Sequence, residues 1–334
     1  MIGVFDPREL LHAPAREMHN GGWTPHAETP ARAESIAAAL PPLLPARDHG
    51  RDPLLAVHTA EYLDFLENAH RLWRDAGRDG DALPYVWPVV GRRPLNLRRI
   101  DALLGRFSFD AATPVASGTW KAAYWGAQTA LTALDTVLGG AHAFALCRPP
   151  GHHAGADYFG GYCYLNNAAI AARAARNAGH ARVAVLDVDY HHGNGTQDIF
   201  AGDASVFFAS LHADPATDYP FYWGHADETG DGAGTGTTLN LPLPRGTAIA
   251  PYLAALDIAL ARIAAFAPSL LVVPFGADTF AGDPISGFAL ATADYPAVAA
   301  RIASLGLPAL VVMEGGYATA ELGANVAAFL SGFD

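Results

Sequence analysis

The stretch VAVLDVDYHHGNG, residues 183–195, decides the fold class and predicts much of the site. Residues 183–188 are apolar except for Asp187, which is typical of a strand buried on both faces of a parallel sheet. The polar residues that follow mark the point where such a strand leaves the core. Because ligand sites in open parallel sheets form outside the carboxyl ends of the strands, we expect Asp189 and His191 to belong to a site.

Further apolar runs of similar length recur along the chain and alternate with helical patterns. In addition to 183–188, we predict strands at 2–5, 54–57, 143–147, 205–211, 270–275 and 308–313. We expect helices near 30–40, 59–75, 119–138, 165–179, 249–266, 294–305 and 320–331. We expect Thr59, Thr119 and Thr247 to be the N-caps of the helices near 59–75, 119–138 and 249–266. This alternation predicts an α/β fold, with a mostly parallel central sheet and helices on both faces.

No linker or repeat divides the chain, so we expect one domain over residues 1–334. Two long stretches, about 76–118 and 212–247, interrupt the alternation. Loops of this length inside a compact domain are usually functional or contact a partner, although ordinary surface excursions remain an alternative.

The composition excludes several classes of protein. The 334 residues carry a formal net charge of −12 and include one lysine, Lys121, which disfavours nucleic-acid binding. Cys147 and Cys163 are too few for a disulfide framework and form no CxxC pair, which fits a reducing compartment. The N-terminus lacks signal-peptide features, and no uninterrupted apolar run approaches about 18 residues. We therefore expect a soluble, cytoplasmic protein that does not bind membranes.

Polar clusters follow four of the predicted strands, and parallel strands would bring all four to one edge. The clusters are RPPGHHAG (148–155), DYHHGNG (189–195), GADTFAGD (276–283) and EGGY (314–317). If the strand continues past 188, Asp187, Asp189 and His191 share a face, since residues two apart point the same way. With Asp278 as third ligand, Asp189 and His191 form an Asp2His set that leaves a metal open to water and substrate. For Asp189 or His191 alone, a structural role is an equal alternative.

The tandem histidines, His152 and His153, and Tyr317 complete the expected site. Near-neutral imidazoles suit proton transfer, and Asp187 could hold one of them through its ring N–H. Two glycines before Tyr317 let the chain turn and aim the hydroxyl at a developing oxyanion. Taken singly, these residues are more often solvated loop histidines and a core tyrosine. Together with the metal ligands they predict metal-assisted hydrolysis of an amide or ester, and no GxSxG elbow is present.

Several long motifs occur in an order that resembles one known family. They are HAETPAR (26–32), VHTAEYLDFL (57–66), RPPGHHA (148–154), FGGYCYLNNAAIAA (159–172), VAVLDVDYHHGNGTQDIF (183–200), FFASLHADP (207–215), FGADTFAGDPISGF (275–288) and VVMEGGY (311–317). The chain resembles the zinc-dependent histone deacetylase and acetylpolyamine amidohydrolase superfamily. It looks most like the bacterial acetylpolyamine amidohydrolases, and the resemblance implies the arginase–deacetylase fold.

The resemblance implies a role for each site residue. Asp189, His191 and Asp278 match the ligands of a zinc ion, for which Fe²⁺ is an alternative. His153 matches the general base that later protonates the leaving amine, and His152 matches its electrostatic partner. The remaining catalytic matches are Asp187, which supports His152, Asn194, which stands beside His153 where many deacetylases have an aspartate, and the carbonyl-polarising Tyr317.

Two further sets of residues are matched by the resemblance. Gly161, Tyr162 and Tyr219 match the wall of a tunnel that holds the alkyl chain of an acylated amine, and a core aromatic is an alternative for Tyr219. Asp187, Ser210 and Leu211 match a structural potassium site. The arginase relatives need two manganese ions and an Asp-x-Asp pair, whereas Asp278 is followed by Thr279 and Phe280, so one catalytic metal is expected.

The substrate follows less directly. The loop insertion at about 76–118 resembles one that narrows the tunnel and joins a homodimer, which favours acetylpolyamines. Residues 78 to 110, however, include more arginines than aspartates: six (78, 92, 93, 98, 99, 106) against four (79, 81, 101, 110). This excess of positive charge would repel a polyamine unless the arginines pair elsewhere. Acetyl-lysine in peptides or proteins and other small acylated amines remain alternatives. A catalytically silent binding module is a remote alternative. So is a redox or synthase enzyme, because such an enzyme would normally carry a nucleotide-binding signature and no GxGxxG follows a predicted strand.

Overall fold

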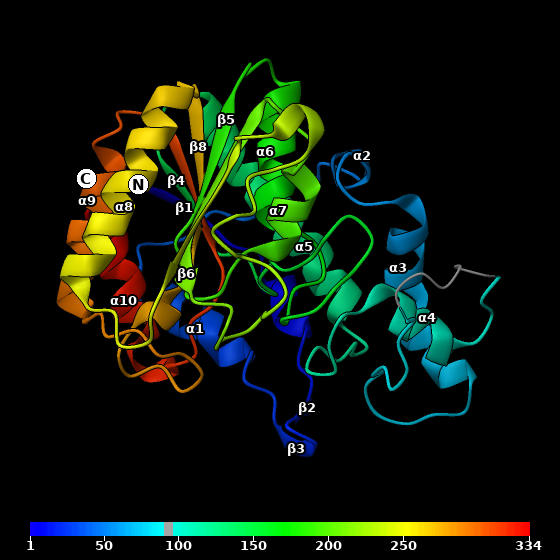
Figure 1. Cartoon of the computed structure of the whole chain (residues 1–334). Helices are drawn as coiled ribbons and strands as arrows, with labels where there is room; N and C mark the ends of the chain where they lie inside the picture. The colour runs from blue at the N-terminus through cyan, green and yellow to red at the C-terminus, as the bar shows by residue number, and fades with distance from the viewer. Residues whose placement is uncertain (90–95) are drawn as a thin grey trace.

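A computed structural model describes residues 1–89 and 96–334, and a seven-stranded sheet lies at its centre (Figure 1). Every paired neighbour in this sheet is parallel, in the order β1-β4-β9-β8-β5-β6-β7. The strands are β1 (Ile2–Val4), β4 (Ala143–Ala145), β5 (Val183–Asp187), β6 (Val206–Ala213), β7 (Thr238–Leu243), β8 (Leu270–Phe275) and β9 (Ala309–Met313). A separate antiparallel hairpin joins β2 (Arg16–His19) to β3 (Gly22–Pro25).

Helices cover both faces of the sheet. They are α1 (Pro30–Ala39), α2 (Asp52–Leu55), α3 (Ala60–Asp75), α4 (Ile100–Phe107), α5 (Thr119–Leu138), α6 (Asn167–Asn177), α7 (Asn194–Phe200), α8 (Ile249–Phe266), α9 (Tyr295–Ala303) and α10 (Thr319–Ser331). In Figure 1, α8, α9 and α10 lie on one side and α5 and α6 on the other. Side chains alternate between the two resulting cores: Val185 of β5 packs into the α5 and α6 side, and Leu186 into the α8 to α10 side. The predicted α/β fold with helices on both faces is confirmed.

One predicted strand is wrong. Residues 54–57 belong to the short helix α2 and the turn after it. Leu54 and Val57 are apolar because both are buried in the core, at 0% and 9% exposure. A four-residue apolar run does not distinguish a strand from a buried helical turn, and Pro53 at the start of the segment favours the helix.

Of the three predicted N-caps, one is found. The Thr59 hydroxyl accepts a hydrogen bond from the Tyr62 N–H at 3.3 Å and caps α3. The prediction is wrong for Thr119, which lies inside α5 after the N-cap Gly118, and whose hydroxyl accepts from the Ala116 N–H. It is also wrong for Thr247, whose hydroxyl donates to the Pro244 carbonyl at 2.7 Å.

The two long stretches contain regular structure that the sequence pattern did not predict. Helix α4 lies within 76–118, and strand β7 lies within 212–247. β7 stands at one end of the sheet order, and it contains Pro242, a residue that sheets tolerate at edges. Its side chains are only partly buried, so the strand lacks the continuous apolar signature of β5 or β8.

Helix α8 is the one described helix that is long and apolar enough to cross a membrane by length and composition. Its residues Tyr252, Leu256 and Ile263 are buried in the core on the α8 to α10 side of the sheet. Packing against the sheet therefore explains the apolar character of this face.

Candidate active site

The carboxyl ends of four neighbouring strands form the edge that carries the site. β4, β9, β8 and β5 are consecutive in the sheet, so the polar clusters after them meet as the sequence predicts. One detail differs, because β5 ends at Asp187 and the chain turns at once. The His191 N–H donates to Asp189 Oδ1 at 2.8 Å, which closes this turn. Asp189 and His191 are therefore brought together by a turn. The expectation that the strand continues past residue 188 and places them on one face is wrong.

Asp189, His191 and Asp278 form a compact, buried cluster. One ligand atom from each lies within 4.8 Å of the others, and His191 Nδ1 is 3.0 Å from Asp278 Oδ2 and 3.3 Å from Asp189 Oδ1. Both aspartates are 0% exposed and His191 is 9% exposed. Backbone amides fix the carboxylates: the Tyr190 N–H donates to Asp278 Oδ1 and the Gly315 N–H donates to Asp189 Oδ2.

The charge and donor chemistry of this cluster fit a divalent metal ion. Burial, and then the charge of Asp189, raise the pKa of Asp278 to about 7, because two buried carboxylates lie close together around His191. Carboxylate oxygens and an imidazole nitrogen suit Zn²⁺ or Fe²⁺. The backbone closes tightly on the pair at Gly315, where a Cβ would lie 2.3 Å from Asp278 Oδ2 and 2.6 Å from Asp189 Oδ2. A larger residue there would disturb the ligands.

The tandem histidines lie beside this cluster and differ in their partners. Their ring centroids are 4.0 Å apart, and both residues are buried. His152 Nδ1 donates to Asp187 Oδ2 at 3.0 Å, whereas His153 Nδ1 donates to the amide oxygen of Asn194 at 2.7 Å. Burial opposes a charged His152, but Asp187 and Asp189 outweigh it and raise the pKa of His152 to about 10. Burial, and then the neighbouring His152 and His191, lower the pKa of His153, which leaves it neutral and able to accept a proton.

Tyr317 stands on the turn after β9. Gly316 has a φ of +120°, and the Tyr317 N–H donates to Asp283 Oδ2 at 2.6 Å. The guanidinium of Arg32 lies 4.8 Å from the centre of the tyrosine ring. Burial raises the pKa of Tyr317 well above its usual value, so the side chain remains a neutral phenol that can donate a hydrogen bond.

The three residues expected to line a tunnel surround these groups. The Tyr162 ring centroid is 5.7 Å from that of Tyr317, and the Tyr219 ring centroid is 5.2 Å from that of His153. Gly161 has a φ of +56°, and a Cβ there would lie 2.2 Å from His153 Cδ2. The glycine therefore allows the backbone to lie directly against the imidazole. The structure thus places Gly161 and Tyr219 beside His153 and Tyr162 beside Tyr317, and their role as a tunnel wall stays a prediction.

Comparisons with known proteins place the chain in a family. Residues 26–333 match the histone deacetylase domain. The chain belongs to the histone deacetylase family. Acetylpolyamine amidohydrolase 1 of Pseudomonas aeruginosa is 48% identical, with 100% of this chain and 99% of that protein covered. Acetylpolyamine amidohydrolase of Mycoplana ramosa is 46% identical, with 98% of each covered.

A solved structure gives the same result. The crystal structure of acetylpolyamine aminohydrolase from Burkholderia pseudomallei has a TM-score of 0.96 and 43% identity, and 100% of this chain and 98% of that chain are covered. The HD domain of HDA15 has a TM-score of 0.82 at 31% identity, with 99% of this chain and 90% of that chain covered. The resemblance, the fold class and the expectation of a deacetylase acting on amide bonds are confirmed. This deacetylase-family chain carries the predicted single-domain arginase–deacetylase fold.

Two residues of this histone deacetylase family member were missed by the sequence reasoning. Glu314 is fully buried, and its Oε2 accepts from the N–H groups of Gly151 at 2.6 Å and His152 at 3.1 Å. It therefore holds the loop that carries the tandem histidines. A carboxylate directly after the apolar run 308–313 was an available signal.

The second missed residue is Asp110. Its Oδ2 accepts from the Gly161 N–H at 2.7 Å and from the Tyr219 hydroxyl at 2.9 Å. Asp110 therefore joins the end of the 76–118 stretch to Gly161 and Tyr219. No local pattern marks it, because the contact joins segments 51 and 109 residues apart.

The residues expected at a potassium site lie on neighbouring strands. The register of β5 and β6 pairs Asp187 with Ser210, and Leu211 follows on β6. Ser210 Oγ is 2.8 Å from His212 Nδ1. Potassium at this site stays a prediction.

Several arginines of the 76–118 stretch form ion pairs. Arg99 pairs with Asp101 at 2.9 Å, Arg78 pairs with the same carboxylate, and Arg106 pairs with Glu61 at 2.9 Å. Arg92 and Arg93, also counted as basic groups near the opening, lie outside the described residues. Glu61 compensates one of the six counted arginines, whereas Asp101 is already one of the four counted aspartates.

Proposed function

We propose that this chain is a metal-dependent amidohydrolase that releases acetate from N-acetylated polyamines. The observation that carries the proposal is the meeting of the Asp189, His191 and Asp278 cluster with His153 and Tyr317 at one strand edge. The substrate class is supported by the names of the relatives, which are acetylpolyamine amidohydrolases at 43–48% identity.

Asp189, His191 and Asp278 would hold the ion, Zn²⁺ or alternatively Fe²⁺. When bound, the ion supplies Lewis acidity for the amide carbonyl and the attacking water. His153 accepts a proton from that water at Nε2, because its Nδ1 is committed to Asn194. It then delivers the proton to the amine nitrogen as the C–N bond breaks, so that one amide and one water give acetate and an amine.

The other residues stabilise charge and position. The Tyr317 hydroxyl donates to the substrate oxygen as negative charge develops on it. His152, held by Asp187, keeps a positive charge beside the reacting groups. Gly161, Tyr162 and Tyr219 flank the alkyl chain of the substrate. Asp187, Ser210 and the Leu211 carbonyl would hold a structural potassium ion.

We also propose that the enzyme acts in the cytoplasm as a homodimer joined through the 76–118 stretch. Exposed apolar side chains support this surface: Tyr85 and Val89 are 70% exposed, and Trp23 on the β2–β3 hairpin is 50% exposed. Patches of this kind are typical of protein contacts. The net charge of −12 favours the approach of a cationic amine.

The proposal is tested by comparing kcat/KM for N-acetylputrescine, N-acetylspermidine and an acetyl-lysine peptide with the metal-loaded enzyme. We expect the acetylpolyamines to be preferred by at least about tenfold, which corresponds to about 1.4 kcal/mol of transition-state stabilisation. Preference for the peptide would replace the substrate assignment. No acetate from any of the three would overturn the proposed activity.

A further inference from the structure

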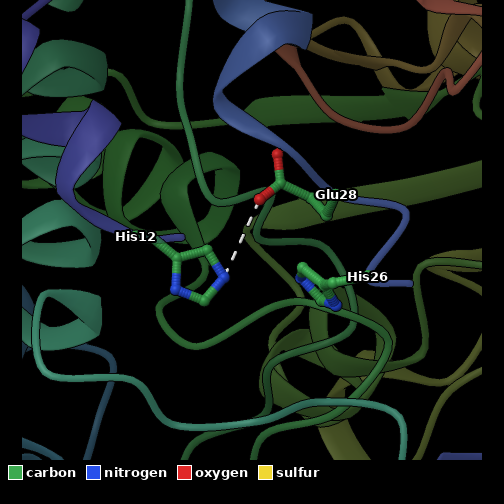
Figure 2. Close-up of side chains that lie close together, drawn as sticks. All are labelled: His12, His26 and Glu28. Atoms are coloured by element: carbon green, nitrogen blue, oxygen red, sulfur yellow. Dashed lines mark ion pairs between the residues drawn. The ribbon is translucent and has the colours of Figure 1, made fainter. Parts of the chain in front are cut away.

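A second buried cluster of metal-ligating side chains shares no residue with the Asp189, His191 and Asp278 cluster (Figure 2). It consists of His12, His26 and Glu28, which are 0%, 4% and 0% exposed. His12 follows the 3₁₀ turn Pro7–Leu11, His26 follows β3, and Glu28 precedes α1. None of these residues takes part in the proposed reaction.

One polar atom of each side chain has no hydrogen-bond partner among the described residues. These atoms are His12 Nε2, His26 Nε2 and Glu28 Oε2, and all three are buried. One ligand atom of each residue lies within 4.8 Å of the others, and the separation of 3.8 Å between His12 Nε2 and Glu28 Oε2 exceeds a hydrogen bond (Figure 2). An unpaired buried polar group is destabilising, so a species bound between them would relieve all three.

The other polar atom of each side chain is already held in place. His26 Nδ1 donates to Glu17 Oε2 at 2.8 Å, so its buried Nε2 keeps a lone pair that can bind a metal. This carboxylate–histidine pairing is the usual way in which proteins orient an imidazole toward a metal. His12 Nδ1 lies 2.9 Å from Thr119 Oγ1. The rings are therefore oriented before any ion binds.

Glu28 is held in the same manner. Its Oε1 accepts from Arg32 Nη1 at 2.7 Å and from Arg148 Nε at 2.9 Å, which leaves Oε2 free to face the histidines. In all three side chains, contacts at one polar atom therefore hold the group in place while the other polar atom has no partner.

We propose that His12, His26 and Glu28 bind a divalent transition-metal ion, separate from the one assigned to the active site. Two imidazoles and one carboxylate are a recurring ligand set for Fe²⁺ and also suit Zn²⁺. The charge of Glu28 is already matched by Arg32 and Arg148, whereas no arginine pairs with Asp189 or Asp278 among the described residues. The positive charge of an added ion therefore meets less uncompensated negative charge here than between Asp189 and Asp278. We expect this site to fill second.

The ion at this site is structural. Arg148 Nη2 donates to the carbonyls of His12 at 2.6 Å and Glu28 at 3.1 Å, and Arg148 begins the loop that carries His152 and His153. The cluster therefore ties the N-terminal segment to the base of that loop. It contributes no group to the reacting atoms.

The test is the metal content of the full chain, measured without any activity assay. Metal-free protein is dialysed against Zn²⁺ or Co²⁺, and bound metal per chain is measured by mass spectrometry. We expect two ions in the wild type, one in His12→Asn, one in His26→Asn and one in Asp278→Asn. His19→Asn, which removes an exposed histidine of β2, is the matched control and should retain two.

A wild type that holds one ion, with the same content in His12→Asn, would overturn the proposal and leave water as the occupant. If the His12 or His26 variants fail to fold, the wild type alone decides. Anomalous scattering from crystals grown with Zn²⁺ should then show a peak between the three side chains, and a peak only at Asp189 and Asp278 would contradict the proposal. Because these readouts do not depend on acetate release, they are distinguishable from a failure of the proposed function.

Discussion

The ligand clusters at the strand edge and at the N-terminal segment have similar chemistry but are built differently. Asp278 lies just beyond the end of β8 and Asp189 just beyond β5, and backbone N–H groups fix their carboxylates. His12 and His26 come from irregular chain, and other side chains fix their rings. The sheet therefore dictates the first cluster, whereas the second depends on long-range contacts between side chains. We therefore expect a catalytic metal ion at the strand edge and a structural one at the N-terminal segment.

The largest effect should come from removing a ligand at each cluster. Asp278→Asn should lower kcat/KM for N-acetylputrescine by at least about 1,000-fold, because the metal-activated step is lost. His12→Asn should remove one metal ion but keep kcat/KM within about fivefold, because the N-terminal cluster touches no reacting group. Both variants are assayed at saturating metal with circular dichroism as the folding control. Equal losses of activity in the two variants would break the distinction.

Tyr317→Phe should leave the metal content unchanged and lower kcat by about 100- to 1,000-fold. This is the range expected for the loss of one donor to a developing oxyanion. The measurement pairs metal analysis with steady-state kinetics on the same preparation. Activity close to the wild type would remove Tyr317 from the mechanism, and lost metal would show that the effect acts through the ligands instead.

Glu314 tests how far the strand edge depends on its support. Glu314→Ala leaves the Gly151 and His152 N–H groups unpaired and buried, which should lower the free energy of unfolding by about 1–3 kcal/mol for each. The displaced histidine loop should also lower kcat by about tenfold.

Glu314→Gln is the matched variant, because it keeps an acceptor oxygen for these two groups. It should recover most of the stability and of kcat. Urea unfolding and kinetics check both, and an alanine variant as stable and active as wild type would show that the loop needs no such support.

The sequence predicted the parts of the molecule that follow from periodicity. Buried strands such as 270–275 are continuous apolar runs, and Asp278 could be assigned because it follows one of them. The half-buried edge strand β7 and the helical run at 54–57 were missed because their burial is set by neighbours. Asp110 and the pairing of Glu28 with Arg148 were missed for the same reason, since their partners lie 51 to 120 residues away.

His58 provides a reference for the unpaired histidines of the N-terminal cluster. It is buried, but both ring nitrogens are bonded, to the Gly155 carbonyl at 2.9 Å and the Asn166 N–H at 3.0 Å. Burial lowers the pKa of His58 to about 4 from 6.5. The unfolded chain therefore binds the proton first as the pH falls, so the stability from His58 is present above about pH 6.5 and decreases toward pH 4.

This predicts the smallest effect. The stability difference between wild type and His58→Asn should shrink by up to about 1.4 kcal/mol for each pH unit between 6.5 and 4. Urea unfolding of both proteins at pH 7, 6 and 5 measures it. A difference that stays constant with pH would contradict a neutral, buried His58.

The most direct test of the account is acetate release from N-acetylputrescine as Zn²⁺ is added stepwise to the metal-free wild type. The account predicts that the rate rises linearly and reaches a plateau near one equivalent per chain, because the Asp189, His191 and Asp278 cluster fills first and alone supports the reaction. Acetate release by the metal-free protein, or none at any Zn²⁺ concentration, would contradict it.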